Sequence, residues 1–240
     1  MPTFEQAGIS LYYEEFGSGY PLLLFAPGGM RSSIEFWHKS PFDPTKEFAA
    51  DFRVIAMDQR NAGHSRGPVS AADGWHTYTA DHIALLDHLG IARCHTMGGC
   101  IGSSYCLNLI KEAPDRVSSA VLQNPIGLHE NREAFREMFD GWAKALQGHD
   151  SSLTDNALTS FREHMYGGDF VFSVTRDFVR KCTHPLIVLA GDDLYHPAPI
   201  SREIASLAPK AEIVETWQTP GTIPAVVRRV RDFLKSHQDR

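Results

Sequence analysis

The chain has 240 residues, of which 42% are hydrophobic and 22% are charged. These proportions are ordinary for a globular protein, so they exclude a disordered or collagen-like chain. The length suits one domain, or one domain with a modest insertion. The 23 basic and 29 acidic residues leave a net charge of −6. This argues against a nucleic-acid binder, because such a protein needs a basic face to neutralise phosphates.

The apolar runs are short, and the longest lie at 21–27 and 185–190. Each suits one buried strand rather than the ~20 residues of a membrane helix. The first five residues have neither a basic start nor an apolar stretch, so we expect no signal peptide. We therefore expect a cytoplasmic protein without a membrane partner, in which the 4 cysteines are reduced thiols.

Strand and helix signals alternate along most of the chain. The patterns predict strands at 9–16, 22–26, 52–57, 93–97, 117–123, 186–189 and 212–217. They predict helices at 78–89, 103–113, 130–147, about 199–207 and 223–236. Continuous apolar strands separated by helices are typical of an α/β fold, with a mostly parallel central sheet and helices on both faces.

The pattern changes between residues 126 and 184, which indicate mostly helix. We therefore predict a core formed by residues 1–125 and 185–240, with a small helical cap inserted at 126–184. In sheets of this kind the chemistry lies in loops at the carboxyl ends of the strands. These loops begin near Pro27, Asp58, Gly99, Asn124, Gly191 and Gln218.

The most informative of these loops joins the predicted strand 93–97 to the predicted helix 103–113. It carries the motif Gly-x-Cys-x-Gly, formed by Gly98, Cys100 and Gly102. Glycines on both sides of a central residue allow a sharp turn, which lifts Cys100 above the sheet at the amino end of a helix. That position favours a thiolate and is typical of a nucleophile elbow with Cys in place of Ser. The alternative is a packing turn with a buried structural cysteine. A dinucleotide site is disfavoured, because the glycines do not fit Gly-x-Gly-x-x-Gly.

With this motif the chain resembles α/β-hydrolases over nearly its whole length, as a cysteine-nucleophile variant. Residues 22–30, Leu-Leu-Leu-Phe-Ala-Pro-Gly-Gly-Met, resemble the oxyanion strand and loop of that family, which often has His-Gly at the Ala-Pro positions. Residues 58–65 resemble its Asp-x-Arg-Gly-x-Gly-x-Ser turn, with Asn61 in place of a glycine. The resemblance implies the α/β-hydrolase fold and is much less specific for the substrate.

The family places a catalytic acid after the next-to-last strand, in the pattern Gly-x-x-Asp-x-x-x-Pro. Here the stretch from Gly191 to Pro197 is one residue short of that pattern. Counting back from Pro197 selects Asp193 as the acid, with Asp192 as the reserve. Either aspartate could instead cap the following helix.

The histidine of the family follows the last strand, but the loop 217–224 contains none. The two histidines on loops at the predicted active edge are His196 and His64. We favour His196 as the base, because it lies three residues from Asp193 and can reach that carboxylate by a hydrogen bond. A cysteine also needs less help from a base than a serine does. The alternatives are His64 as the base and a His196 that only anchors its loop.

Two backbone N–H groups are expected to form an oxyanion hole. One should belong to Ile101, directly after the nucleophile. The second should come from Gly28 or Gly29, where the absence of a side chain lets the backbone approach the substrate. The sequence does not decide which of these two glycines is the donor.

Trp37, Trp142 and Trp217 are expected to line the substrate pocket together with aromatic residues of the cap. An apolar, aromatic pocket of modest size suggests a small or medium acyl compound. We therefore predict hydrolysis of a carboxylic ester, thioester or lactone through a Cys100 acyl-enzyme. The alternatives are an acyltransferase, a non-hydrolytic lyase, which the missing histidine favours, and a hydrolase-derived binding protein without turnover.

No metal or organic cofactor is expected, because the sequence shows no cysteine–histidine ligand spacing and no phosphate-binding loop. The expected partner is a small-molecule acyl substrate. The sequence leaves a homodimer open.

Overall fold

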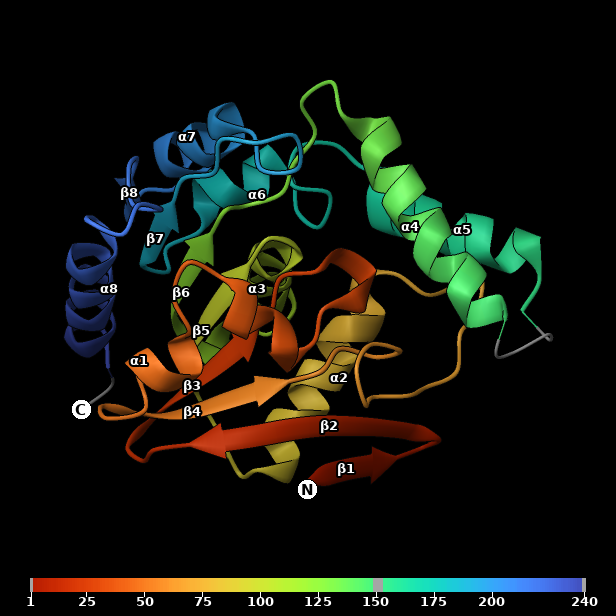
Figure 1. Cartoon of the computed structure of the whole chain (residues 1–240), viewed down its shortest axis with the longest axis horizontal. Coiled ribbons are helices and arrows are strands. Elements are labelled where there is room, and N and C mark those ends of the chain that lie inside the picture. Colours follow the sequence, from red (N-terminus) through yellow and green to blue (C-terminus); the bar gives the residue numbers. More distant parts are fainter. Residues whose placement is uncertain (1, 149–152, 239–240) are drawn as a thin grey trace.

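The computed structural model describes residues 2–148 and 153–238, and Figure 1 shows its fold. Eight strands form one sheet in the order β1-β2-β4-β3-β5-β6-β7-β8. They are β1 (Thr3–Gln6), β2 (Ile9–Phe16), β3 (Tyr20–Phe25), β4 (Phe52–Met57), β5 (Cys94–Gly99), β6 (Val117–Gln123), β7 (Leu186–Leu189) and β8 (Ala211–Val214). β2 pairs antiparallel with β1 and β4, and all other neighbours pair parallel. The predicted α/β fold with a mostly parallel sheet is confirmed.

Helices connect the strands and cover the sheet. The α-helices are α1 (Pro44–Glu47), α2 (Trp75–His88), α3 (Ile101–Glu112), α4 (Arg132–Gln147), α5 (Asp155–Tyr166), α6 (Arg176–Lys181), α7 (Ala198–Leu207) and α8 (Ile223–Ser236). Short 3₁₀ turns are η1 (Gly29–Arg31), η2 (Ile34–Lys39) and η3 (Pro114–Arg116). In Figure 1, α8 and the α4–α5 pair lie at opposite sides of the molecule.

The core is divided by the sheet into two apolar layers. In β3, Leu23 and Phe25 belong to the layer that also contains buried residues of α2 and α3. Their neighbours Leu22 and Leu24 belong to the opposite layer, together with residues of η2 and α8. Because side chains alternate along a strand, an uninterrupted apolar run serves both faces at once. This is why the central strands were visible in the sequence.

Most predicted elements are present. The strands at 9–16, 52–57, 117–123 and 186–189 and the helix at 223–236 have the predicted bounds. The strand predicted at 212–217 ends earlier, at Val214. The sequence analysis missed β1, an edge strand of four residues without the alternating buried pattern that marks a half-buried strand. It also missed the short helices α1 and α6.

The segment predicted as a cap contains α4, α5 and α6. α4 packs against α5 and against η1, whereas α6 packs against α7, beside β7 and β8. Residues 1, 149–152 and 239–240, which belong to the predicted core and cap, lie outside the described residues. Within the described ranges no helix has both the length and the apolar character needed to traverse a lipid bilayer.

Candidate active site

A sharp turn between β5 and α3 carries Cys100. The backbone of Cys100 has φ 57° and ψ −120°, values that a non-glycine residue rarely adopts. A Cβ atom on Gly98 would lie 2.0 Å from the carbonyl oxygen of Gly102, and one on Gly102 would lie 2.1 Å from that of Phe25. Both glycines are therefore required by close backbone contacts, and the turn has the geometry of the predicted elbow.

Cys100 differs from the other cysteines in exposure and in acidity. It is half-buried, whereas Cys94, Cys106 and Cys182 are buried. Burial raises the pKa of Cys94 and of Cys106 to about 12, and it also raises the pKa of Cys182. Burial acts on Cys100 in the same direction, but the neighbouring His196 outweighs it and lowers the pKa of this thiol.

Two backbone amides also stabilise the thiolate of Cys100. The N–H groups of Gly28 and Ile101 donate to the sulfur, and both contribute to its lowered pKa. Ile101 is the first residue of α3, and Gly28 follows β3, with φ 117°. Gly29, with φ 58°, lines the cavity beside the thiol. Of the two glycines that the sequence left open, the structure directs the amide of Gly28 at the sulfur.

His196 and Asp193 lie together in the loop between β7 and α7. Nδ1 of His196 is 2.8 Å from Oδ2 of Asp193. Oδ1 of the same carboxylate accepts the N–H groups of Tyr195 and His196, at 2.9 and 3.0 Å. The carboxylate therefore fixes the loop and selects the tautomer with the proton on Nδ1, which directs Nε2 toward Cys100.

The charges of this group of residues are mutually stabilising. Nε2 of His196 is buried and forms no hydrogen bond of standard geometry with the described residues, so its interaction with Cys100 is mainly one of charge. Burial alone would lower the pKa of His196, but Cys100 first and Asp193 second raise it to about 9. The pKa of Asp193 is lowered, because its hydrogen bonds and the charge of His196 outweigh its burial. The directions of these three shifts favour a thiolate–imidazolium pair beside a carboxylate over a neutral thiol and imidazole.

Asp192 and His64 lie outside this arrangement. Asp192 is exposed, and its carboxylate has no hydrogen-bond partner in the part of the chain that the structure describes. α7 has Pro197 at its N-cap and no side-chain cap, so neither aspartate caps that helix. Nδ1 of His64 lies 3.2 Å from Oδ2 of Asp58, and its side chain is 70% exposed. His64 does not line the cavity at Cys100.

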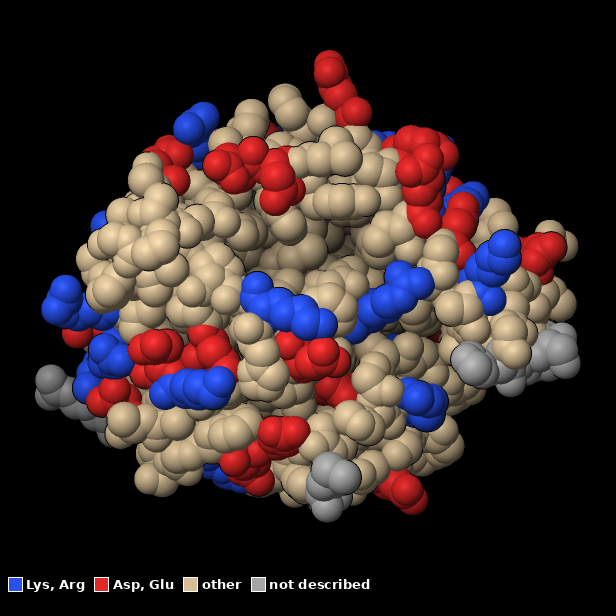
Figure 2. Space-filling view, viewed as in Figure 1, with Lys and Arg blue, Asp and Glu red and all other residues tan. Residues whose placement is uncertain are grey.

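A cavity of about 230 Å³ opens beside the thiol. It is mostly apolar and is lined by Gly28, Gly29, Cys100, Ile101, Ile126, Phe135, Met138, Tyr166, Tyr195 and His196. The hydroxyl of Tyr166 donates to the sulfur of Met30 at 3.6 Å, a weak acceptor, so it remains available for a polar group of a substrate. Figure 2 shows that this face of the molecule is hollowed beside the cap helices.

The prediction that Trp37, Trp142 and Trp217 line the substrate pocket is wrong for the cavity at Cys100. Trp37 is fully buried behind Gly99, and the indole of Trp217 is buried and donates to the carbonyl of Ala190 at 2.8 Å. Trp142 lines a separate groove. None of the three lines the cavity at Cys100. Trp217, which follows β8, packs where the family pattern would begin its histidine loop.

Sequence reasoning missed two lining residues, Ile126 and Tyr195. Ile126 follows the end of β6, and Tyr195 directly precedes His196. Their positions in loops at the carboxyl ends of strands were the available signal. Which side of each loop faces the thiol depends on backbone conformation, and composition does not reveal it.

Residues 21–180 match the family model described as alpha/beta hydrolase fold. The chain therefore belongs to the α/β-hydrolase fold family of enzymes.

Three similar proteins each match most of this chain. It is 26% identical to BpoC of Mycobacterium tuberculosis, named as a candidate non-heme bromoperoxidase, over 86% of this chain and 88% of that protein. The enol-lactonase from Burkholderia xenovorans LB400 superposes with a TM-score of 0.69 at 22% identity, covering 98% of this chain and 100% of the other. A meta-cleavage product hydrolase from Pseudomonas fluorescens IP01 gives 0.71 at 17% identity, covering 99% and 98%. At these identities the two structural likenesses show the fold alone.

Proposed function

We propose that this enzyme hydrolyses a small carboxylic ester, thioester or lactone through an acyl-enzyme on Cys100. One observation carries the proposal. The sulfur of Cys100 is met by the imidazole of His196 and by the backbone N–H groups of Gly28 and Ile101. A nucleophile, a proton carrier and two fixed donors then surround one point of the cavity, as acyl transfer requires.

In the first half of the reaction the thiolate attacks the carbonyl carbon of the substrate. The C=O π electrons move to oxygen, and the N–H groups of Gly28 and Ile101 stabilise the oxyanion. When the C=O bond re-forms, the bond to the leaving group breaks. His196 gives its Nε2 proton to the departing alkoxide or thiolate, and an acyl thioester remains on Cys100.

In the second half, the now neutral His196 accepts a proton from water, and the resulting hydroxide adds to the acyl carbon. The same two amides hold the second oxyanion. Its collapse expels the thiolate of Cys100 and releases the acid. Asp193 keeps the Nδ1 proton in place and stabilises the imidazolium of each step, as the 2.8 Å contact allows.

The size of the cavity supports a small acyl group. Pockets that enclose drug-sized ligands measure roughly 300–1,000 Å³. The cavity beside Cys100 measures about 230 Å³ and is walled mostly by apolar side chains, including Phe135 and Met138. We therefore expect short acyl chains to react faster than long ones.

Turnover of p-nitrophenyl acetate by matched cysteine variants tests this function. Cys100→Ala should abolish hydrolysis, while Cys182→Ala, a buried cysteine outside the cavity, should retain it. Cys100→Ser should fold but lose most activity, because a hydroxyl needs a stronger base than a thiol. Full activity of Cys100→Ala would refute the proposal. Product analysis with an added alcohol or thiol acceptor separates hydrolysis from acyl transfer, and cleavage of a carbon–carbon bond would indicate a lyase.

A further inference from the structure

The hydroxyl of Tyr166 is a buried polar group in the cavity at Cys100, and its hydrogen-bond acceptor is a weak one. Tyr166 is the last residue of α5 and is 1% exposed. Among the described residues, its hydroxyl donates to the thioether of Met30, with 3.6 Å between oxygen and sulfur. A thioether accepts hydrogen bonds only weakly, and a buried hydroxyl without a good acceptor is energetically unfavourable. A substrate oxygen at this position would therefore replace a weak acceptor with a strong one.

Neighbouring side chains hold the ring of Tyr166 in one orientation. The ring stacks on Phe135, with 5.4 Å between the centroids and 22° between the planes, and it meets Phe172 edge-on at 5.5 Å. Nη1 of Arg132 donates to the backbone carbonyl of Tyr166. The hydroxyl is thus placed before a substrate binds, so little conformational freedom is lost when it forms a new hydrogen bond.

The hydroxyl of Tyr166 stays protonated beside the thiol. Burial first, and the charge of Cys100 second, raise the pKa of Tyr166 well above its ordinary value. Both residues line the same cavity. Tyr166 therefore offers a neutral O–H donor to the substrate and does not compete with His196 for the role of base.

The acceptor Met30 lies beside the proposed oxyanion donors. It belongs to η1 and comes two residues after Gly28, whose N–H group points at the sulfur of Cys100. The hydroxyl of Tyr166 therefore lies on the oxyanion side of the cavity. Because the cavity measures only about 230 Å³, a substrate oxygen that reaches this hydroxyl is carried by a carbon close to the scissile carbonyl, at C-2 or C-3 of the acyl group.

The ring of Phe135 separates Tyr166 from the side of the leaving group. It contacts Tyr166 and Tyr195, with centroid distances of 5.4 and 5.5 Å. Tyr195 directly precedes His196, which protonates the leaving group in the proposed reaction. We therefore expect the leaving group beside Tyr195 and the acyl group beside Tyr166. The hydroxyl of Tyr195 is not equivalent, because Tyr195 is only partly buried and water can satisfy it.

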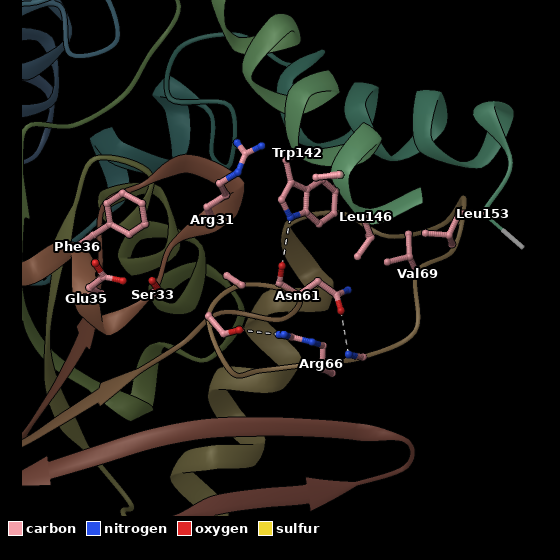
Figure 3. Close-up of a pocket in the computed structure, with 14 residues that line it drawn as sticks. Arg31, Ser33, Glu35, Phe36, Asn61, Arg66, Val69, Trp142, Leu146 and Leu153 are labelled. Atoms are coloured by element: carbon pink, nitrogen blue, oxygen red, sulfur yellow. Dashed lines mark hydrogen bonds between the residues drawn. The ribbon is translucent and has the colours of Figure 1, made fainter. Parts of the chain in front are cut away.

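Met138 closes the acyl side of the cavity. Its thioether lies against Gly29, where an added Cβ would be 2.5 Å from the sulfur. Trp142, one helical turn further along α4, lines a separate groove, in which its indole N–H donates to the carbonyl of Asn61 at 3.2 Å (Figure 3). The indole therefore supplies no donor to the cavity at Cys100, and the acyl group that fits there is short.

We propose that Tyr166 selects short acyl groups that carry a hydroxyl or keto oxygen on C-2 or C-3. This oxygen accepts the hydrogen bond that the hydroxyl of Tyr166 gives to Met30 when no substrate is bound. The selectivity rests on the proposed function, because it concerns the acyl group that Cys100 receives. An apolar acyl group of the same size leaves the hydroxyl with its weak acceptor and should react more slowly.

Ester pairs that exchange a hydroxyl for a methyl group test this selectivity. The pairs are the p-nitrophenyl esters of glycolate and propionate, and those of 3-hydroxypropionate and butyrate. For each pair, the ratio of kcat/KM for the hydroxyacyl ester to that for the alkyl ester is compared between wild type and Tyr166→Phe. In at least one pair this ratio should fall roughly three- to tenfold in the variant, the effect of one lost neutral hydrogen bond. The intrinsic reactivity of each ester is the same with both proteins, so it cancels in the comparison.

Two further variants separate the hydroxyl from its packing. Tyr78→Phe removes a buried hydroxyl outside the cavity and should leave the ratio unchanged. Met30→Leu keeps the hydroxyl of Tyr166 and removes its acceptor at similar volume, so the ratio should be kept or rise. Thermal melting confirms that each variant is folded.

Two outcomes would overturn the selectivity while hydrolysis through Cys100 persists. One is an unchanged ratio in Tyr166→Phe for both ester pairs, and the other is an equal fall in Met30→Leu. If the wild-type protein hydrolyses none of the four esters, the proposed function itself fails, and the selectivity of Tyr166 fails with it.

Discussion

Replacing His196 with alanine should make Cys100 a weaker acid. The interactions of His196 raise its pKa from 6.5 to about 9, and the largest favourable cause is Cys100. A rise of this size corresponds to about 3 kcal/mol of preference for the imidazolium. The coupling between two titrating groups is reciprocal, so loss of the imidazolium removes the same energy from the thiolate. Asp193 contributes part of the energy that raises the pKa of His196. We therefore assign about 1–3 kcal/mol to the interaction between His196 and Cys100, and its loss should lower the thiolate population of Cys100 roughly tenfold to hundredfold.

The assay is the rate of carbamidomethylation of Cys100 by iodoacetamide, followed against pH by peptide mass analysis. At pH 7 the rate in His196→Ala should fall roughly tenfold to hundredfold, because the thiolate is the reactive species. His64→Ala is the matched control, since that histidine is 70% exposed and lies beside Asp58. An unchanged pH profile in His196→Ala would refute the thiolate–imidazolium pair, and an equal loss in His64→Ala would show that the assay does not report this contact.

Three further predictions concern the carboxylate of Asp193, the pH dependence set by Cys100 and His196, and the glycine Gly102 in the turn at Cys100. Asp193→Asn should lower kcat about 10²-fold or more with little change in melting temperature, because the carboxylate orients His196, whereas Asp192→Asn should be nearly silent. kcat/KM should decline as the pH rises through about 9, where His196 loses its proton, and also as the pH falls through the lowered thiol pKa. A flat profile from pH 6 to 10 would contradict the assignment of the pair. Gly102→Ala should destabilise the fold by about 3 kcal/mol or more, since its Cβ would lie 2.1 Å from a carbonyl oxygen. Gly141→Ala on α4, with open space around it, should instead stabilise by about 0.5–1 kcal/mol in a denaturant titration.

The central strands and the elbow could be predicted because their constraints are local. An apolar run buried on both faces has few alternatives to a central strand, as in β4 and β6. The glycines of the elbow reflect contacts within a few residues of Cys100. The pairing of His196 with Asp193 was accessible for the same reason, because three residues of loop suffice to bring the two side chains together.

The lining of the cavity could not be predicted, because it depends on how distant segments pack. An aromatic residue near the active edge can face either the ligand or the core. Trp37 and Trp217 both face the core on the α8 side of the sheet. Trp142 lies one helical turn beyond Met138 on α4, and this difference places it in the groove instead of the cavity. The choice between Gly28 and Gly29 likewise depends on amide directions that only the folded loop defines.

The central claim is that Cys100 carries an acyl group during turnover. Rapid mixing with p-nitrophenyl acetate, acid quench within the first turnover and intact-mass analysis test it directly, with peptide mapping to locate the adduct. We predict the mass increase of one acetyl group, on the peptide that contains Cys100, and its absence in Cys100→Ala. Turnover of the ester with the acetyl group on another residue, or an equal adduct in Cys100→Ala, would contradict the account.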